Sequence, residues 1–351
     1  MRMRVGSKLR VFSASKRRVF SATCLLAGAC ASVMAQEPEE ADLSAKQRIL
    51  PTIGPGLRAV RQGPDGRLYV LASPSPGLVV VDAKGKQLLS INELQSPGSA
   101  GDASANQSLI AFGEDCDVDA EGKIYLADRG ANLVRVFGSD GAPLRSFPVK
   151  NPVSVAVMPE GEVAVATLRE PHLVIVFDKN GKEVREFGDP EPISGREDLN
   201  RFLNIGQLGT DEQGHLYYAF GYLPEPTVRQ YDRQGYGGQD IQYTAIDALP
   251  TSVAVRKEIE KQEQRTKEPS FRRVLTALGV DRSNGEVWMA LNNNLLHFDA
   301  AGKRRATYKI YTPQGARLEA KTILVEKDHL IIGSDPLGLY LFDRPDKRST
   351  K

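Results

Sequence analysis

Apolar and polar positions alternate in short runs along most of the chain, and turns separate these runs. One kind of turn leads into an apolar or alternating run six times: "GPDGRLYV" (63–70), "DAEGKIYL" (119–126), "MPEGEVAV" (158–165), "DEQGHLYY" (211–218), "DRSNGEVWMA" (281–290) and "VEKDHLII" (325–332). Such a run next to a turn predicts a β-strand that leaves a hairpin.

A second element follows each of these turns at a similar distance. It is an apolar strand that leads into a turn, rich in Asp and Gly in most copies: "LVVVDAKGK" (78–86), "VRVFGSDGA" (134–142), "VIVFDKNGK" (174–182), "VRQYDRQGY" (228–236), "LLHFDAAGK" (295–303) and "LYLFDRPDK" (339–347). Glycine supplies the positive φ that a tight hairpin needs. Two motifs that recur six times in one order predict a repeated unit.

Most units have two further strands. One precedes the first turn, as in "LRAVRQ" (57–62) and "PVSVAV" (152–157), and another follows most of the second turns. Six such units predict an all-β fold, a six-bladed β-propeller with four antiparallel strands per blade, over residues 46–347. The sixth unit lacks a fourth strand, and "QRILPTI" (47–53) belongs to no hairpin. We therefore expect this N-terminal strand to complete the last blade.

Four segments fall outside the repeat. Residues 92–112 are rich in Ser, Gly and Ala and predict a mobile loop insertion. Residues 251–268 predict a helical insertion with Ser252 as a candidate cap, and we expect the helix to be exposed because its apolar residues end at Ile259. Residues 36–45 are expected to be flexible, and 348–351 form a short tail.

The N-terminal 35 residues have the features of a signal peptide. Seven basic residues and no acid precede an apolar run, and small residues at Val33 and Ala35 mark a cleavage site before Gln36. "KRRVFS" (16–21) resembles the twin-arginine export motif, so both that route and the general secretory route stay open. A lipid anchor at Cys30 is a further alternative. We expect an exported protein, periplasmic or extracellular, with no transmembrane span.

The charge of the chain bears on its binding partners, and its cysteine content bears on disulfide formation. Without the seven basic residues of the signal, 39 of the 46 basic residues remain against 44 acidic ones, a net charge of −5. This balance gives no basic footprint for nucleic acid. Cys116 has no intrachain partner once Cys24 and Cys30 are removed, so we expect it to pack between blades. The expected state is a monomer.

The stretch "DVDAEGKIYLADRGANLVRVF" (117–137) resembles an NHL-type propeller repeat in its turn Gly122, its Asp128 and its final strand to Phe137. The other five blades keep the turns but not the "ADxxxNxxxxxF" pattern. The resemblance is to the NHL-like six-bladed propellers of the TolB-like and lactonase-like superfamily. It implies the fold, but these propellers include binding scaffolds, sugar-lactone hydrolases and an amidating lyase, so it does not select an activity.

The innermost strands of a propeller converge at the axis, which places their first residues in a shared funnel. These first residues and the positions just inside them are Arg58, Glu114, Asp115, Asn151, Asn204, Gln207, Thr276 and Lys321. We predict that they form the ligand-binding funnel. No catalytic residue is predicted.

Two functions are consistent with this funnel. The preferred one is a binding or scaffold protein that recognises a protein, peptide or glycan through the funnel and the loops at 92–112 and 217–227. The alternative is a metal-dependent hydrolase or lyase. For the alternative, Glu114, Asn151 and Asn204 offer the carboxylate and amide oxygens that Ca²⁺ or another divalent cation accepts, as the lactonase-like resemblance implies. A polar, water-filled channel without a cofactor explains the same residues.

Overall fold

A computed structural model describes residues 39–50, 56–73, 76–91, 110–168, 171–264, 271–336 and 338–345. Several predictions lie outside the described residues: the signal peptide with Cys30, residues 36–38 and 51–53, most of the loop insertion (92–109), the end of the helical insertion (265–268) and the tail.

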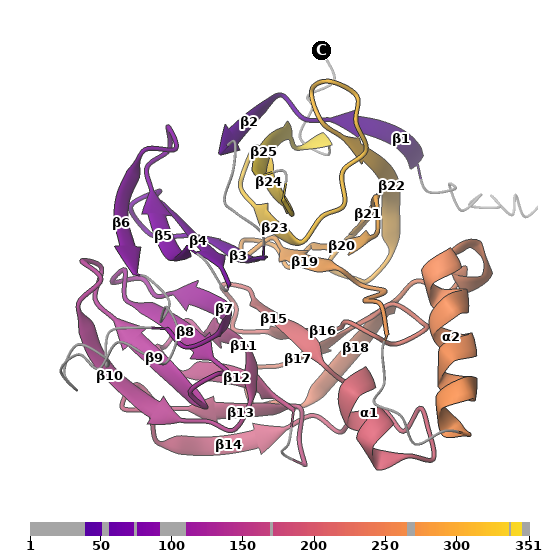
Figure 1. The fold of residues 1–351 in the computed structure, drawn as a ribbon, viewed down its shortest axis with the longest axis horizontal. Helices are drawn as coiled ribbons and strands as arrows, with labels where there is room; N and C mark the ends of the chain where they lie inside the picture. The colour runs from indigo at the N-terminus through magenta and orange to yellow at the C-terminus, as the bar shows by residue number, and fades with distance from the viewer. Residues whose placement is uncertain are drawn as a thin grey trace, which may run out of the picture. The chain divides into compact units, whose positions relative to one another are not determined.

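The described residues form six sheets, and each contains four antiparallel strands of one blade (Figure 1). Blade one consists of β3 (Leu57–Gln62), β4 (Leu68–Ala72), β5 (Gly77–Val81) and β6 (Gln87–Ile91). Blade two consists of β7 (Gly113–Val118), β8 (Ile124–Asp128), β9 (Leu133–Phe137) and β10 (Pro143–Pro148). Blade three consists of β11 (Pro152–Val157), β12 (Val163–Thr167), β13 (Val174–Phe177) and β14 (Glu183–Phe187). Blade four consists of β15 (Gly206–Thr210), β16 (Leu216–Phe220), β17 (Thr227–Tyr231) and β18 (Gly237–Gln242). Blade five consists of β19 (Ala277–Val280), β20 (Val287–Leu291), β21 (Asn294–Phe298) and β22 (Arg304–Tyr311), and blade six contains β23 (Thr322–Val325), β24 (His329–Ser334) and β25 (Gly338–Asp343).

The blades close into a ring around the innermost strands. Strands β3, β7, β11, β15, β19 and β23 contact one another in this order, and β23 contacts β3 (Figure 1). Close approach is possible where side chains are absent: a Cβ on Gly279 in β19 would lie 2.6 Å from Cγ2 of Ile323 in β23. The predicted six-bladed β-propeller is confirmed.

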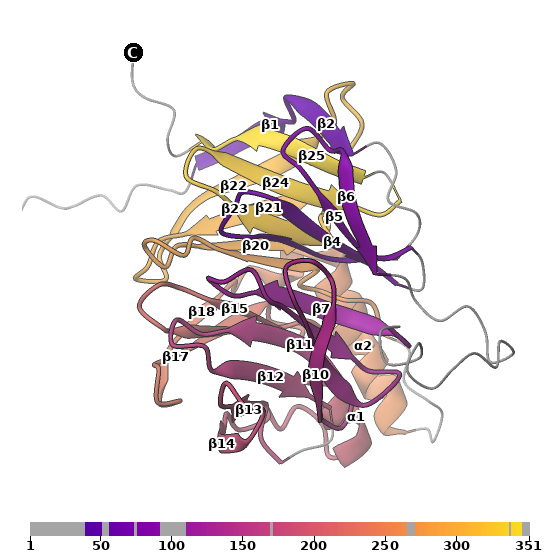
Figure 2. The same ribbon diagram turned by 90° about the vertical axis from the view of Figure 1, so that its left-hand side faces the viewer.

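Two N-terminal strands join the last two blades (Figures 1 and 2). The strand β2 (Gln47–Leu50) pairs antiparallel with β25 and supplies the fourth strand of blade six, which confirms the predicted closure for these residues. The strand β1 (Glu39–Ser44) pairs parallel with β22 and adds a fifth strand to blade five. For residues 39–44, this corrects the expectation of a flexible segment at 36–45. Pairing with β22 and burial of Leu43, which is 1% exposed, order this acidic stretch.

The predicted hairpin turns have a common geometry. In the β5–β6 turn, Oδ1 of Asp82 accepts hydrogen bonds from the backbone N–H groups of Lys84 and Lys86, both at 2.9 Å. Gly85 in this turn has a φ of 80°, as the sequence predicted. Asp178, Asp232 and Asp299 make the same pair of bonds in blades three, four and five.

Among the described residues, three helical segments connect blades: α1 (Glu197–Leu203), the 3₁₀-helix η2 (Ile246–Ala248) and α2 (Pro250–Glu263). The predicted helical insertion is confirmed as α2, but its N-cap is Leu249, and Ser252 is buried inside the first turn. The expectation of an exposed helix is also corrected. Val255 and Ile259 are buried in one core cluster that includes residues of α1. Within the described residues, no helix is long and apolar enough to cross a membrane.

Candidate functional site

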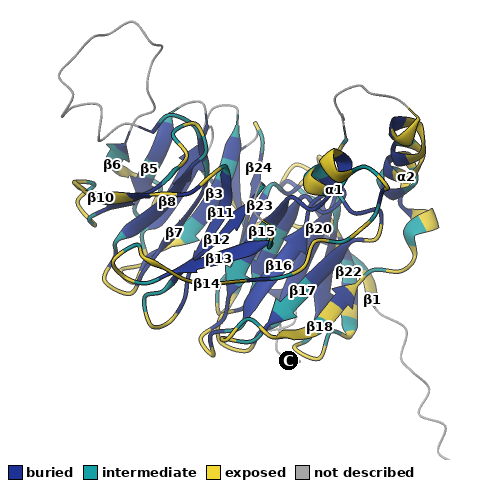
Figure 3. Cartoon of the chain, turned by 90° about the horizontal axis from the view of Figure 1, so that it is seen from below, coloured by how far each residue is buried: buried dark blue, intermediate teal, exposed yellow. Residues whose placement is uncertain are grey.

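The connections between strands give the ring two different faces (Figure 3). The links between the first and second strands of each blade are short hairpins, as are those between the third and fourth strands of blades one to five, and we call their side the hairpin face. The links between blades, and those between the second and third strands, lie on the opposite side, the insertion face, which carries α1, η2 and α2. Loops on a rigid scaffold commonly carry binding residues. The innermost strands begin on the insertion face, where the sequence placed the funnel.

A cavity of about 250 Å³, the axial cavity, lies where these strands begin. Five predicted funnel residues other than Thr276 line it: Arg58, Glu114, Asp115, Gln207 and Lys321. They come from blades one, two, four and six, so strands far apart in the sequence build this cavity together. Thr276, at the start of blade five, also lines it, and its hydroxyl donates to the backbone oxygen of Ala290.

Glu114 is held between two arginines. One of its carboxylate oxygens lies 3.0 Å from Nε of Arg129 and the other 3.4 Å from Nη1 of Arg58. Both guanidinium groups also lie over the ring of Phe112, each 5.1 Å from its centroid. Its negative charge is therefore balanced by side chains of the protein.

Asp128 of the NHL-like stretch holds the backbone beside Phe112 in place. Its carboxylate is fully buried and accepts hydrogen bonds from the backbone N–H groups of Ala111 and Phe112. It also pairs with Nε of Arg135 at 2.7 Å. The motif residue thus orients Phe112, and with it the two arginines beside Glu114.

Asp115 forms the floor of the axial cavity. Its carboxylate accepts hydrogen bonds from Nη2 of Arg61 at 2.9 Å and from the hydroxyl of Ser154, and Ser154 Oγ accepts one from the N–H of Leu208. These bonds connect the innermost strands of blades one to four. Burial raises the pKa of Asp115, although Arg61 and Ser154 oppose this effect.

The structure does not bring Asn151 and Asn204 into the axial cavity, so the proposed metal ligands do not converge. Asn151 has a φ of 46° and occupies the turn before β11, where its N–H donates to Oδ1 of Asn132. Asn204 caps the C-terminus of α1, and its side chain bonds to the backbone of Glu191 and Asn200. It lines a separate cavity of about 510 Å³ beside α1. Among the described residues, no three His, Cys, Asp or Glu side chains form a group that would hold a metal ion.

Sequence reasoning missed an aromatic cluster on the insertion face. Phe202 in α1 lies 4.7 Å from the ring of Tyr222 and 5.5 Å from that of Phe271, and all three are half-buried. We call these residues the aromatic shelf. Arg273 connects the shelf to the axial cavity, because it lines the cavity, lies over the Tyr222 ring and donates through Nε to the Tyr222 hydroxyl at 3.3 Å.

The shelf was missed because its members come from three separate insertions with no common spacing. The predicted loop at 217–227 contained Tyr222, but residues 217–220 belong to β16, and the connection itself is 221–226. Asp335, in the link between β24 and β25, also lines the axial cavity and was not predicted.

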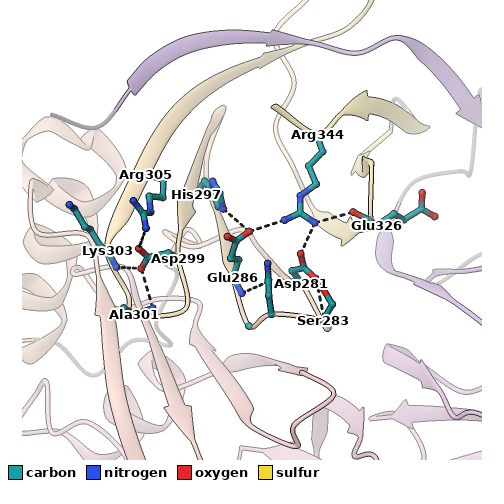
Figure 4. A network of polar contacts seen from close by, with 12 residues as sticks. Asp281, Ser283, Glu286, His297, Asp299, Ala301, Lys303, Arg305, Glu326 and Arg344 are labelled. Atoms are coloured by element: carbon teal, nitrogen blue, oxygen red, sulfur yellow. Dashed lines mark hydrogen bonds and ion pairs between the residues drawn. The ribbon is translucent and has the colours of Figure 1, made fainter. Parts of the chain in front are cut away.

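A larger cavity of about 650 Å³ lies at the other end of the axis, on the hairpin face. Arg61 lines this cavity while its partner Asp115 lines the axial cavity, so their ion pair separates the two. Arg344 also lines this cavity; it is 1% exposed and pairs with Asp281 at 2.6 Å and Glu286 at 2.8 Å (Figure 4). These pairs join the end of blade six to a hairpin of blade five.

Cys116 lies in the core cluster between blades one and two and forms no disulfide. Burial raises the pKa of its thiol. The predicted packing role is confirmed, and a thiol held in its neutral form is a poor nucleophile.

Comparisons with known proteins show the fold but no family. No protein-family model and no curated protein matches the chain. Among solved structures, the hydrazine synthase of Kuenenia stuttgartiensis is 11% identical with a TM-score of 0.52, over 86% of this chain and 99% of that chain. A streptogramin B lyase is 12% identical with a TM-score of 0.50, over 85% and 86%. Virginiamycin B lyase from Staphylococcus aureus is 10% identical with a TM-score of 0.49, over 84% and 87%. At such identities, the likeness to the first two structures shows a shared propeller fold and no more.

Proposed function

We propose that the protein is an exported binding protein that recognises a peptide, protein or glycan on its insertion face. The observation that carries this proposal is the position of the aromatic shelf beside the axial cavity. Aromatic rings supply a large apolar contact area with a polar edge, and both peptides and sugars use such surfaces. The neighbouring cavity supplies fixed polar groups that orient a ligand.

The state of the charged groups in the cavity also favours binding. Glu114 and Asp115 are both paired with arginines. Such pairs hold their side chains in one geometry before a ligand arrives, which reduces the entropy that binding must overcome. A cavity built in this way suits recognition by shape and charge.

Export is supported by the sequence of residues 1–35, with their basic start, apolar run and small residues before Gln36. The NHL-like stretch at 117–137 supports membership of a propeller group that includes binding scaffolds. Expression in a bacterial host tests the export step. We expect the mature protein in the periplasmic or extracellular fraction with Gln36 as its first residue; a cytoplasmic protein that keeps Met1 would refute export.

The binding proposal is tested with labelled protein on peptide and glycan arrays. Tyr222→Ala removes part of the shelf, and Tyr236→Ala is its matched control, because Tyr236 is 74% exposed on the hairpin face of the same blade. We expect the wild-type protein and Tyr236→Ala to bind the same array members, and Tyr222→Ala to lose them. Equal binding by both variants, or no array member bound by the wild type, would reject the proposal.

A further inference from the structure

Three cationic side chains line the axial cavity: Arg58, Arg273 and Lys321. They belong to blade one, to the segment before blade five and to the segment before blade six, so the fold alone brings them together. A volume of about 250 Å³ is smaller than a typical pocket for a drug-sized ligand. The cavity therefore suits one terminal group of a larger ligand.

Of these three cations, only Arg58 has an acidic partner among the described residues of the cavity. Glu114 is shared between Arg58 and Arg129, and Asp115 is paired with Arg61. In the part of the chain that the structure describes, neither Arg273 nor Lys321 forms an ion pair with a carboxylate. Of the three described acidic residues that line the cavity, Glu114 and Asp115 already have cationic partners.

Asp335 is the remaining acid of the lining, and it is held in place by the backbone. Its Oδ2 accepts a hydrogen bond at 2.9 Å from the N–H of Gly56. Asp335 carries one negative charge, whereas Arg273 and Lys321 together carry two positive charges. This part of the cavity therefore has an excess of positive charge. Gln207 adds a side-chain amide that can donate to an oxygen atom.

Arg273 is also oriented before a ligand binds. Its guanidinium carbon lies 5.6 Å from the centroid of the Tyr222 ring, and its Nε donates to the hydroxyl of the same residue. This contact uses the inner nitrogen, and the two terminal nitrogens have the planar fork that matches a carboxylate. Arg273 thus stands between the aromatic shelf and the cavity.

From this arrangement we propose that the axial cavity binds a carboxylate group of the ligand through Arg273 and Lys321. The inference rests on the proposed function and names the chemistry of the group that enters the cavity. The same chemistry has two sources among the proposed ligands, the C-terminal carboxylate of a peptide and the carboxylate of an acidic sugar. In both cases the shelf holds the part of the ligand that remains outside.

The test is a calorimetric titration with small acids and their neutral amides. Acetyl-Gly-Gly is compared with acetyl-Gly-Gly amide for the peptide source, and glucuronate with glucuronamide for the sugar source. We expect at least one acid to bind in the millimolar range or tighter, at least tenfold more tightly than its amide, and more weakly as salt is added. The arm that responds identifies the source.

Two variants and two controls assign the binding to the cavity. Lys321→Met and Arg273→Gln each remove one cation and should weaken binding of the acid by roughly tenfold, the effect of losing a charged hydrogen-bond partner. Lys309→Met and Arg317→Gln make the same changes at exposed positions outside the cavity and should leave binding unchanged. The folded state of each variant is checked by its melting temperature.

The outcomes separate this inference from the proposed function. If acid and amide bind equally, if neither acid binds, or if the cavity variants behave like their controls, the carboxylate site is rejected, even when Tyr222→Ala abolishes array binding. If an acid binds through Lys321 and Arg273 while Tyr222→Ala leaves array binding intact, the carboxylate site stands and the shelf loses its role.

Discussion

Arg344 offers the sharpest test of how the last blade is fastened to its neighbour. Its side chain is 1% exposed and reaches Asp281 and Glu286 in the β19–β20 hairpin, and Nη1 also donates to the backbone oxygen of Glu326 at 3.1 Å (Figure 4). Arg344→Met keeps most of the side-chain volume and removes the charge. It leaves the carboxylate of Asp281, which is 9% exposed, and that of Glu286, which is 22% exposed, without their cation.

The magnitude follows from what remains after the substitution. Removal of one partner from a buried ion pair costs about 3–5 kcal/mol. Asp281 keeps its two hydrogen bonds from Ser283, and Glu286 keeps its contact with His297 at 3.2 Å, so we expect the lower end, about 3 kcal/mol. For a propeller of about 300 residues, this lowers the melting temperature by roughly 5 °C.

The assay is urea unfolding followed by the fluorescence of Trp288, the single tryptophan of the chain, which is buried in β20 of the same blade. Arg305→Met is the matched control, because Arg305 is 56% exposed and pairs with Asp299 in another hairpin of blade five. An exposed pair contributes less than about 1 kcal/mol. Equal, small losses in the two variants would refute the reasoning, since they would mean that burial does not distinguish the pairs.

The pH dependence provides a second readout of the same contact. Burial alone would raise the pKa of Asp281, but hydrogen bonds from Ser283 and Arg344 lower it overall. A lowered pKa in the folded state gives stability that is present above the unfolded pKa of about 3.9 and is lost as the pH falls through the folded value. The stability difference between wild type and Arg344→Met should therefore narrow as the pH falls from 7 to 3. A constant difference would assign the loss to packing.

Three further predictions concern other parts of the ring. Leu43→Ala in β1 should cost about 2–4 kcal/mol in urea unfolding, because Leu43 is 1% exposed in a core cluster; a loss below 1 kcal/mol would mean that β1 adds little. Gly279→Ala should cost about 1–3 kcal/mol in the same assay, since its methyl group would meet Ile323, and an unchanged midpoint would contradict the close approach. Because Glu114 already has two arginine partners, a chelator should leave the melting temperature unchanged; a drop that Glu114→Gln abolishes would restore the metal hypothesis.

The repeat was predictable because local chemistry determines it. The strands β3 and β11 have the bounds read from the sequence, and the Asp turns of the hairpin face have the expected geometry. Each of these features depends on residues within one hairpin. Patterns of period two and turns with glycine need no knowledge of the rest of the chain.

The insertion face was harder to predict because its structure depends on distant contacts. The helix α1 has seven residues, and its N-cap Arg196 makes no side-chain cap, so it lacks the usual start signal. The predicted position of Asn204 in the funnel came from its distance to the next turn. In the structure it is the C-cap of α1. The strand β1 is acidic and has one strongly apolar residue that is buried, so its pairing with β22 could not be read from its own sequence.

The difference between the two faces bears on the location of the proposed ligand site. On the hairpin face, each Asp-containing turn satisfies its own backbone N–H groups, as Asp82 does, so these turns are fixed by their own residues. On the insertion face, positions are fixed between segments: Asp128 holds Phe112, and Tyr222 holds Arg273. A turn that is fixed by itself can repeat six times without change, whereas contacts between segments differ from blade to blade. Recognition of one ligand requires a surface that is not symmetric, and contacts of the second kind supply such a surface around the axial cavity and the aromatic shelf.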